Sequence, residues 1–192
     1  MRRHLVVMVK EPRPGRVKTR VAAGIGSVGA AWWYRHQCTR LLKRLDDPRW
    51  QLWLAVAPDH EGMASRVWPG HLTRRPQGLG GLGTRMGRIF RDLPPGPAVI
   101  VGSDIPGIMP AHIAAAFAAL GPAPSVLGPA PDGGYWLIGL RRRRVPAGLF
   151  KDVRWSGPQA MADTEKTLEA PVAHIATLQD VDTLEDLQKL MK

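Results

Sequence analysis

The chain has 192 residues, about the length of one domain, and its 27 Lys and Arg against 16 Asp and Glu give a formal net charge of +11. This excess favours an anionic partner: a nucleic acid, a phosphorylated small molecule or an anionic membrane surface. The single cysteine, Cys38, excludes an internal disulfide, and no apolar run is long enough to cross a bilayer, so we expect a cytoplasmic protein.

Short apolar segments alternate with segments of helical periodicity along the chain. We expect strands at residues 5–9, 51–57, 98–101, 125–127, 135–140 and 172–175. We expect helices at residues 27–45, 84–92, 111–120, 164–168 and 182–190, the first with Ser27 as its N-cap. This alternation predicts an α/β fold, one domain over residues 1–192 with a mostly parallel central sheet and helices on both faces. The arginine run 141–144 is interpreted as a solvated cluster that protects a sheet edge.

The first predicted strand runs into a loop with dense positive charge, KEPRPGRVKTR. Gly15 permits close approach of a ligand to the backbone, and the prolines restrict the loop. Arg binds phosphate oxygens by bidentate pairing and Lys binds them as a point charge, so the loop favours a phosphate clamp. It is not a Walker P-loop, because G-x-x-x-x-G-K-[ST] is absent. A solvated basic loop without a ligand is the alternative.

A glycine-rich run, GLGGLG, matches the dinucleotide-binding pattern G-x-G-x-x-G. The preceding HLTRRPQ is not a convincing buried strand, so we reject a dinucleotide site. We interpret the run as a flexible loop that leads into the helix at 84–92, whose N-terminus, with Arg85, favours an anion. A plain turn is the alternative.

Acidic residues follow several of the predicted strands. Asp104 comes just after a buried strand, where a carboxylate suits a divalent cation that holds phosphate oxygens; a local turn or cap is the alternative. Asp132 precedes two glycines, a combination also typical of a hairpin turn. Asp180 and Asp182 precede the last helix, where Asp182 is either a second metal ligand or part of a helix cap.

Six segments, in order over nearly the whole chain, resemble one known family. It is the group of small glycosyltransferase-like proteins of the nucleotide-diphospho-sugar transferase (GT-A) superfamily, with one branch named for arsenosugar biosynthesis and another found with radical-SAM genes. More distantly, the layout is similar to molybdenum-cofactor and phospholactate nucleotidylyltransferases. The segments are KEPRPGRVKTR, LGTRM, VGSDIP, GPAPDGGYWLIGL, FKDVRWS and LQDVDTLEDL.

The resemblance implies a Rossmann-like GT-A domain that binds a nucleotide over the first loop and Mg²⁺ or Mn²⁺ on Asp104. Either Asp132 or Asp182 would complete the metal site, and Asp182 is the named candidate. The expected phosphate-binding residues are Lys10, Gly15, Arg16, Lys18, Arg20 and Arg85. The expected acceptor-side residues are Asp132, Gly133, Gly134, Tyr135, Trp155 and Ser156, the last two on a flap. We expect Asp104, Lys18 and Asp132 to act in catalysis. The chain departs from its relatives at Gly81, where they often carry Asp, and at Gly157, where they often carry Thr.

We therefore expect a metal-dependent transferase with a nucleotide-activated donor, in first place a nucleotide-sugar glycosyltransferase. The alternative is a nucleotidylyltransferase that joins a nucleoside triphosphate to a small phosphorylated acceptor. Further alternatives are an inactive nucleotide-binding relative, which Gly81 keeps open, and a basic nucleic-acid-binding module. The seven tryptophans are scattered and no nucleic-acid-binding signature occurs, so we expect a nucleotide and a small-molecule acceptor as partners, and neither nucleic acid nor membrane.

Overall fold

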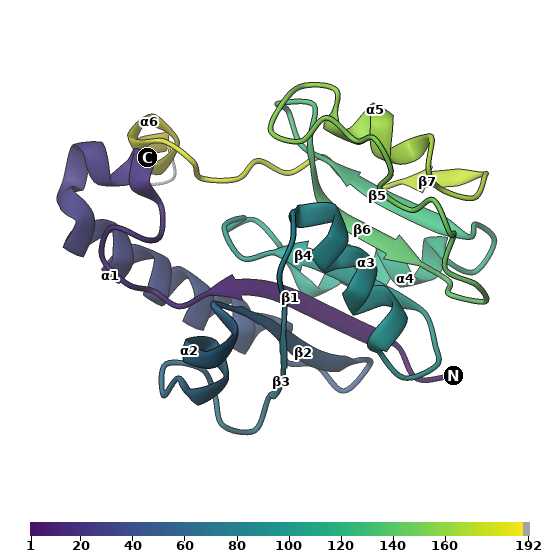
Figure 1. The fold of residues 1–192 in the computed structure, drawn as a ribbon, viewed down its shortest axis with the longest axis horizontal. Helices are drawn as coiled ribbons and strands as arrows, with labels where there is room; N and C mark the ends of the chain where they lie inside the picture. Colours follow the sequence, from purple (N-terminus) through teal and green to yellow (C-terminus); the bar gives the residue numbers. More distant parts are fainter. Residues whose placement is uncertain (190–192) are drawn as a thin grey trace.

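One seven-stranded sheet forms the centre of the computed structural model, which describes residues 1–189 (Figure 1). Its strand order is β3-β2-β1-β4-β6-β5-β7. Four of the six strand pairings are parallel, and β6 runs antiparallel to both its neighbours, which confirms the predicted mostly parallel sheet. The strands are β1 (His4–Lys10), β2 (Gln51–Ala57), β3 (Thr73–Pro76), β4 (Ala98–Gly102), β5 (Ser125–Pro129), β6 (Tyr135–Leu140) and β7 (Val172–His174).

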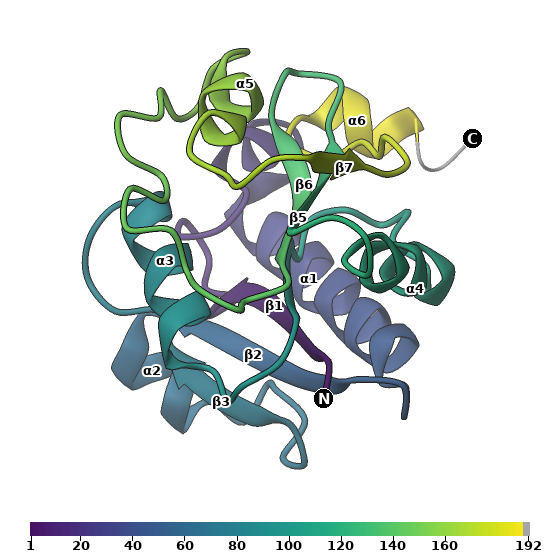
Figure 2. The ribbon, with the colours of Figure 1, turned by 90° about the vertical axis from the view of Figure 1, so that its right-hand side faces the viewer.

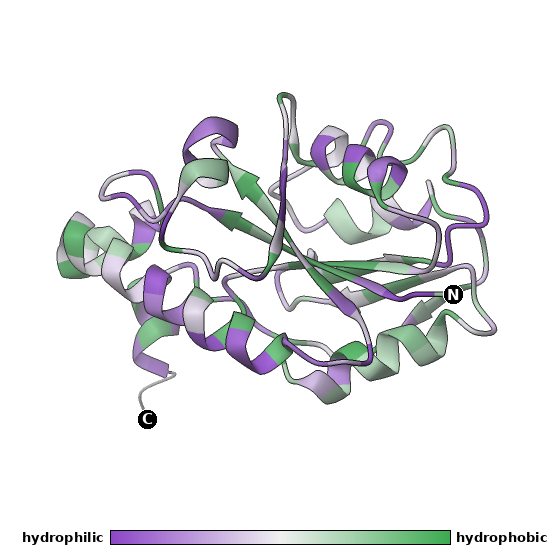
Figure 3. Ribbon diagram, turned by 90° about the horizontal axis from the view of Figure 1, so that it is seen from below, coloured by the Kyte–Doolittle hydropathy of each residue, from purple (hydrophilic) through white to green (hydrophobic). Residues whose placement is uncertain are grey.

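Helices cover both faces of the sheet, as predicted (Figure 2). They are α1 (Thr19–Leu45), α2 (Asp59–Ala64), α3 (Leu82–Asp92), α4 (Pro110–Ala119), α5 (Ala160–Glu165) and α6 (Leu184–Lys189). In β1, Leu5 and Val7 pack in the core cluster with α1 and α4, whereas Val6 packs in the cluster with α3. Successive side chains of a strand point to opposite faces, so one short apolar strand supplies both cores. Figure 3 shows the hydrophobic residues of the strands.

The N-terminal half of the chain differs from the prediction in three elements. Helix α1 begins at Thr19 and includes a non-helical residue at Gly26, next to the predicted start at Ser27. Its first turns form because Val21 is buried against α6, and this packing outweighs the low helix propensity of the glycines. Helix α2 and strand β3 were not predicted. Strand β3 is a short edge strand with no buried residue, so it lacks the apolar pattern of a buried strand.

The C-terminal half differs in smaller ways. Helix α5 lies at Ala160–Glu165, earlier than the predicted 164–168, and the Thr167 hydroxyl donates to the Thr164 carbonyl just after it, a side-chain bond that competes with helix continuation. Helix α6 begins at Leu184 rather than at Asp182, and its predicted last residue, Leu190, lies outside the described residues.

The arginine run after β6 does not protect a sheet edge, because β6 lies between β4 and β5. Arg142 is partly buried and donates to the carbonyls of Leu93 (2.7 Å) and Pro94 (3.0 Å). The interpretation of the run as an edge-protecting cluster was therefore wrong. None of the helices within residues 1–189 is both long and apolar enough to cross a membrane.

Candidate active site

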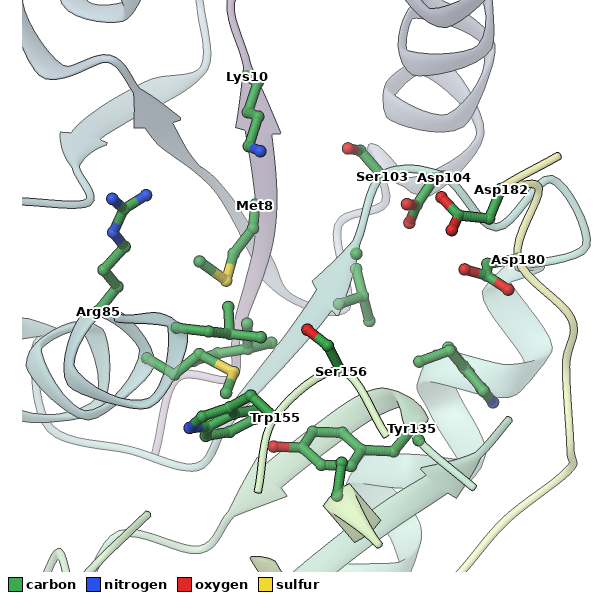
Figure 4. Close-up of a pocket in the computed structure, with 18 of the residues that line it drawn as sticks. Met8, Lys10, Arg85, Ser103, Asp104, Tyr135, Trp155, Ser156, Asp180 and Asp182 are labelled. Atoms are coloured by element: carbon green, nitrogen blue, oxygen red, sulfur yellow. The ribbon is translucent and has the colours of Figure 1, made fainter. Parts of the chain in front are cut away.

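A cavity of about 970 Å³ lies beyond the carboxyl ends of β1 and β4 (Figure 4). This volume is at the upper end of the range for small-molecule sites, about 300–1,000 Å³. The walls come from the loop between β1 and α1, the glycine run before α3, the loop after β4, the β5–β6 hairpin and the segments before α5 and α6. This is the edge at which open α/β sheets bind ligands.

Most of the predicted site residues line this cavity. They are Lys10, Arg16, Lys18, Arg20, Arg85, Asp104, Asp132, Gly134, Tyr135, Trp155, Ser156 and Asp182. Gly15 and Gly133 are not among the lining residues. Gly15 instead completes a turn in which the Arg16 amide donates to the Arg13 carbonyl (3.1 Å), and its φ of 76° is the value that favours glycine at the third position of such a turn.

The central feature of the cavity is a lysine between two carboxylates. Lys18 Nζ lies 2.7 Å from Asp104 Oδ2 and 3.4 Å from Asp182 Oδ1, and the Lys18 side chain is only 7% exposed. Asp104 follows β4, and Asp182 precedes α6. The Val181 amide donates to the Asp104 carbonyl (3.0 Å), so a backbone bond holds the two acidic segments together independently of Lys18.

The other cations of the basic loop have different partners. Arg20 pairs with Asp182 (2.7 Å) but is 75% exposed, and Arg16 pairs with Glu61 of α2 (3.1 Å). Within residues 1–189, Lys10 has no carboxylate at ion-pair distance, so its ammonium group faces the cavity without a competing acid. In Figure 4 Lys10 lies across the cavity from Asp104 and Asp182.

A third acid, Asp180, lines the cavity beside Asp104 and Asp182 (Figure 4). Burial, and then the charge of Asp104, raises the pKa of the Asp180 carboxyl above its ordinary value. Low solvent access and a neighbouring negative charge both disfavour the charged form of the Asp180 carboxyl. The nearby Lys18 acts in the opposite direction.

A buried tyrosine ties the end of β1 to the end of β4. The Tyr34 hydroxyl accepts from the Lys10 amide (3.0 Å) and shares a hydrogen bond with the Ser103 hydroxyl (2.8 Å). Burial raises the pKa of Tyr34 well above its ordinary value, so the phenol stays protonated. Tyr34 therefore fixes the start of the basic loop relative to Asp104, the residue after Ser103.

The glycine run before α3 is held by side chains rather than by a sheet. Arg85 Nε donates to the Gly80 carbonyl (2.8 Å), and its Nη1 lies 3.4 Å from Gln77 Oε1. Gln77 is buried and donates to the carbonyls of Val9 (3.1 Å) and Ala55 (2.8 Å), at the ends of β1 and β2. Arg85 is thus partly engaged in shaping this loop, a role that its predicted place at a helix N-terminus did not include.

The predicted acceptor-side residues lie on two neighbouring segments, both of which line the cavity. Asp132 belongs to the β5–β6 hairpin and accepts from the Gly134 amide (2.9 Å), so the hairpin-turn interpretation describes its local structure and it also lines the cavity. Gly133 lies against the backbone of Pro158. The hairpin and the segment before α5 are therefore packed together.

The segment 150–157, which we call the flap, packs on α3. The rings of Phe150 and Trp155 are tilted against each other with centroids 5.8 Å apart, and both side chains lie against Gly83 of α3. Arg154 holds the base of the flap through a bidentate ion pair with the buried Asp163 (2.7 and 3.0 Å). The hydrogen bonds from Arg154 hold the pKa of Asp163 far below its ordinary value.

The donor set suits a hard divalent cation, although no dense cluster of ligands is present. Within residues 1–189, no three His, Cys, Asp or Glu side chains converge closely enough to hold a metal ion. Asp104 and Asp182 nevertheless both direct carboxylate oxygens at one shared cation, the Lys18 ammonium, and Asp182 also pairs with Arg20. Mg²⁺ is commonly bound by one or two carboxylates with the rest of its shell from water and substrate phosphates. The two carboxylates therefore fit such an ion.

The cavity residues that were not predicted as site residues include Tyr34, Gln77 and Asp180. Tyr34 fits the core spacing of its helix, and Gln77 is a lone amide in a polar stretch, so neither carried a signal. Asp180 was visible beside Asp182 in the segment before the last helix. Its proximity to Asp104 depends on contacts between segments far apart in the chain.

A family model described as "Uncharacterized protein conserved in bacteria (DUF2064)" matches residues 41–157. The match covers more than half of the chain. The chain belongs to this family. None of the curated proteins matches the chain.

Solved structures with similar folds extend this finding. A "putative nucleotide-diphospho-sugar transferase" from Desulfovibrio desulfuricans G20 is 30% identical, with a TM-score of 0.87 over 99% of this chain and 87% of that chain. Rv0371C from Mycobacterium tuberculosis H37Rv, in a complex with manganese, is 13% identical, with a TM-score of 0.60 over 99% of this chain and 98% of that chain. The 2-C-methyl-D-erythritol 4-phosphate cytidylyltransferase from Thermus thermophilus is 12% identical, with a TM-score of 0.58 over 98% of this chain and 97% of that chain. The resemblance to the nucleotide-diphospho-sugar transferase superfamily is thereby confirmed; the two distant structures show the shared fold alone.

Proposed function

We propose that this protein is a transferase that uses a nucleotide-activated donor, in first place a nucleotide sugar, together with Mg²⁺ or Mn²⁺. The observation that carries the proposal is the pair Asp104 and Asp182, which share the Lys18 ammonium inside a cavity that basic residues line. A carboxylate pair beside basic side chains matches the needs of a metal–diphosphate group, whose metal binds the acids and whose remaining charge binds Lys and Arg.

In this proposal Asp104 and Asp182 hold the metal ion, and Lys10, Lys18 and Arg20 contact the phosphates. When bound, the metal would neutralise charge on the phosphate oxygens of the leaving nucleotide. The chain's own contribution is positioning and fixed positive charge: Tyr34 keeps the basic loop in register with Asp104, and the cavity places donor and acceptor together. Gly15 and Arg16 support the phosphate side as parts of the basic loop, and Arg85 supports it from α3 through its bond to the Gly80 carbonyl.

The acceptor is proposed to lie between the β5–β6 hairpin and the flap. Asp132 is the candidate group for accepting a proton from the acceptor, because its carboxylate lines the cavity on the hairpin side. Gly134 and Tyr135 continue this wall, Gly133 lies against Pro158, and Trp155 and Ser156 line the cavity from the flap. The flap would also keep water from the activated donor.

Glycosyl transfer is favoured over the second candidate by the relative from Desulfovibrio desulfuricans G20, whose description names nucleotide-diphospho sugars. The second candidate is nucleotidylyl transfer. It is supported by the four cations that the basic loop contributes to the cavity, Lys10, Arg16, Lys18 and Arg20, because such a number suits a triphosphate. Both reactions use the same metal and phosphate residues.

The test is thermal unfolding in a panel of nucleoside diphosphates, nucleoside triphosphates and nucleotide sugars, each with and without Mg²⁺ or Mn²⁺. A ligand at 100 times its Kd stabilises the folded state by about 2.7 kcal/mol, which for a chain of this length raises Tm by about 5–11 °C. We expect a metal-dependent shift that Asp104→Asn abolishes and that the matched variant Asp132→Asn retains. A larger shift with nucleotide sugars favours glycosyl transfer, and a larger shift with nucleoside triphosphates favours nucleotidylyl transfer. A nucleotide shift that is independent of metal and unchanged in Asp104→Asn would overturn the proposal.

A further inference from the structure

Lys18 has an unusual position for a residue of a phosphate-binding loop. Its ammonium is almost fully buried and points to carboxylates, at 2.7 Å from Asp104 and 3.4 Å from Asp182, rather than into the open cavity. Its backbone adopts the left-handed conformation (φ 48°, ψ 48°) immediately before α1, which is uncommon for a residue other than glycine. Such a conformation persists only where the surroundings hold the residue in place.

The ammonium and a divalent cation would need the same carboxylate oxygens. Asp182 Oδ2 accepts from Arg20, and Asp182 Oδ1 and Asp104 Oδ2 face Lys18, so Lys18 occupies the gap between the two acids. Two cations cannot share this gap, because they would repel each other at short range. A metal ion between Asp104 and Asp182 therefore requires that the Lys18 ammonium leave.

We propose that Lys18 is a built-in counter-cation that exchanges with the metal ion and then binds the donor's phosphates. The exchange rests on the proposed function. It adds a coupling between the binding of the metal ion and the binding of the donor's phosphates. Without an anion, release of Lys18 leaves a buried ammonium without a partner, which opposes metal binding. With a phosphate group in the cavity, the released ammonium gains a new anionic partner. The protein therefore binds the metal ion and the phosphate group tightly when both are present, and binds either one weakly when it is alone.

The acidic pair does not depend on Lys18 for its arrangement. The bond between the Val181 amide and the Asp104 carbonyl (3.0 Å) joins the two acidic segments, and Asp186 caps the segment by accepting from the amides of Asp182 (3.2 Å) and Thr183 (2.9 Å). Replacement of Lys18 should thus remove the competing cation and leave the two carboxylates in place.

The test measures two affinities in three proteins: wild type, Lys18→Met and Lys10→Met. Mn²⁺ binding alone is followed by electron paramagnetic resonance, and binding of inorganic pyrophosphate is measured by calorimetry in saturating Mn²⁺. Lys10→Met is the matched control because it removes the same charge from the same loop, and Lys10 has no carboxylate partner within residues 1–189. Lys18→Gln provides a second variant with a polar side chain if Lys18→Met does not fold.

We expect Lys18→Met to bind Mn²⁺ about 10- to 100-fold more tightly than wild type, the range that corresponds to one charge-assisted hydrogen bond, and to bind pyrophosphate more weakly by a similar factor. Lys10→Met should weaken pyrophosphate binding and leave Mn²⁺ affinity within about twofold, because it does not compete for the carboxylates. If Lys18 had a structural role alone, Lys18→Met would bind both Mn²⁺ and pyrophosphate more weakly than wild type. That result would overturn the exchange.

The failure of the exchange can be separated from the failure of the proposed function. Equal Mn²⁺ affinity in wild type and Lys18→Met, with metal-dependent pyrophosphate binding in both, overturns the exchange and leaves the transferase site intact. An equal gain of Mn²⁺ affinity in Lys10→Met also overturns it, since the gain would then come from net charge alone. No Mn²⁺ binding in any of the three proteins, with or without pyrophosphate, overturns both proposals.

Discussion

The packing of the flap on α3 gives a prediction whose size follows from the geometry. Gly83 and Gly87 lie one turn apart on α3, and both are buried. A Cβ added at Gly83 would lie 2.7 Å from Phe150 Cβ and 2.8 Å from Trp155 Cζ2, closer than carbon atoms pack. At Gly87 the nearest atoms would be Arg91 Nη1 at 3.3 Å and Phe150 Cδ2 at 3.8 Å, which a small shift of the arginine accommodates.

Alanine substitutions at these two positions therefore form a matched pair. Each gains about 1 kcal/mol of helix propensity relative to glycine. Gly83→Ala also forces the aromatic pair of the flap to move, and such overpacking costs about 1–3 kcal/mol. Because the propensity gain is common to both, we expect Gly83→Ala to be about 1–3 kcal/mol less stable than Gly87→Ala. For a chain of this length the difference in Tm is about 2–12 °C.

The assay is urea unfolding of the two variants and the wild type, with thermal unfolding as a second readout. Limited proteolysis of the native proteins adds a local readout, because a displaced flap exposes backbone near Trp155. If Gly83→Ala is as stable as Gly87→Ala and resists proteolysis equally, the flap does not pack on α3 as described, and the acceptor side loses its wall.

Three further predictions concern buried groups. Tyr34→Phe should lower stability by about 1–3 kcal/mol in urea unfolding, since it removes a buried hydroxyl that bonds both the Lys10 amide and Ser103. Tyr135→Phe should cost less than about 1 kcal/mol, because it loses one 3.3 Å bond. Equal costs would contradict the role of Tyr34 as a link. The ion pair with Arg154 stabilises the fold above the ordinary carboxyl pKa of 3.8, and this stabilisation is lost as the pH falls through the lowered folded pKa of Asp163. Asp163→Asn should therefore destabilise the protein at pH 7 and reduce the loss of unfolding free energy at acid pH. An unchanged dependence of stability on pH would refute this. Burial raises the pKa of the Cys38 thiol to about 12, so the native protein should react with an aromatic disulfide reagent only after unfolding, and rapid labelling of the folded protein would contradict the buried position.

Local patterns predicted six of the seven described strands and the place of Asp104 after β4, because both depend on short runs of sequence. The predicted strand at residues 51–57 and the one at 135–140 agree with β2 and β6 to the residue. Asp104 was predicted from a buried strand followed by a turn, and such a strand delivers its next residues to the carboxyl edge of the sheet. The antiparallel direction of β6 could not be predicted from local patterns, since the direction of a strand depends on how it pairs with its neighbours and not on its composition.

The arrangement of charges within the site could not be predicted from the sequence. The basic loop was interpreted as a cluster of cations for phosphates, but Lys18 contacts Asp104 and Asp182, and Arg16 contacts Glu61 on a helix that was not predicted. These partners come from segments distant in the chain, and only the fold brings them together. Gly81 illustrates the opposite case: a Cβ added there would meet nothing within 4 Å, so the departure from relatives leaves open space at the cavity.

The central claim is that Asp104 and Asp182 bind a metal ion that shares a nucleotide's phosphates. The most direct measurement is an anomalous diffraction map from crystals grown with Mn²⁺ and the nucleotide that stabilises the protein most. The account predicts one manganese peak in contact with both carboxylates, with the phosphates beside Lys10 and Arg20. A nucleotide bound in the cavity without manganese at these carboxylates, or manganese bound only elsewhere on the chain, would contradict it.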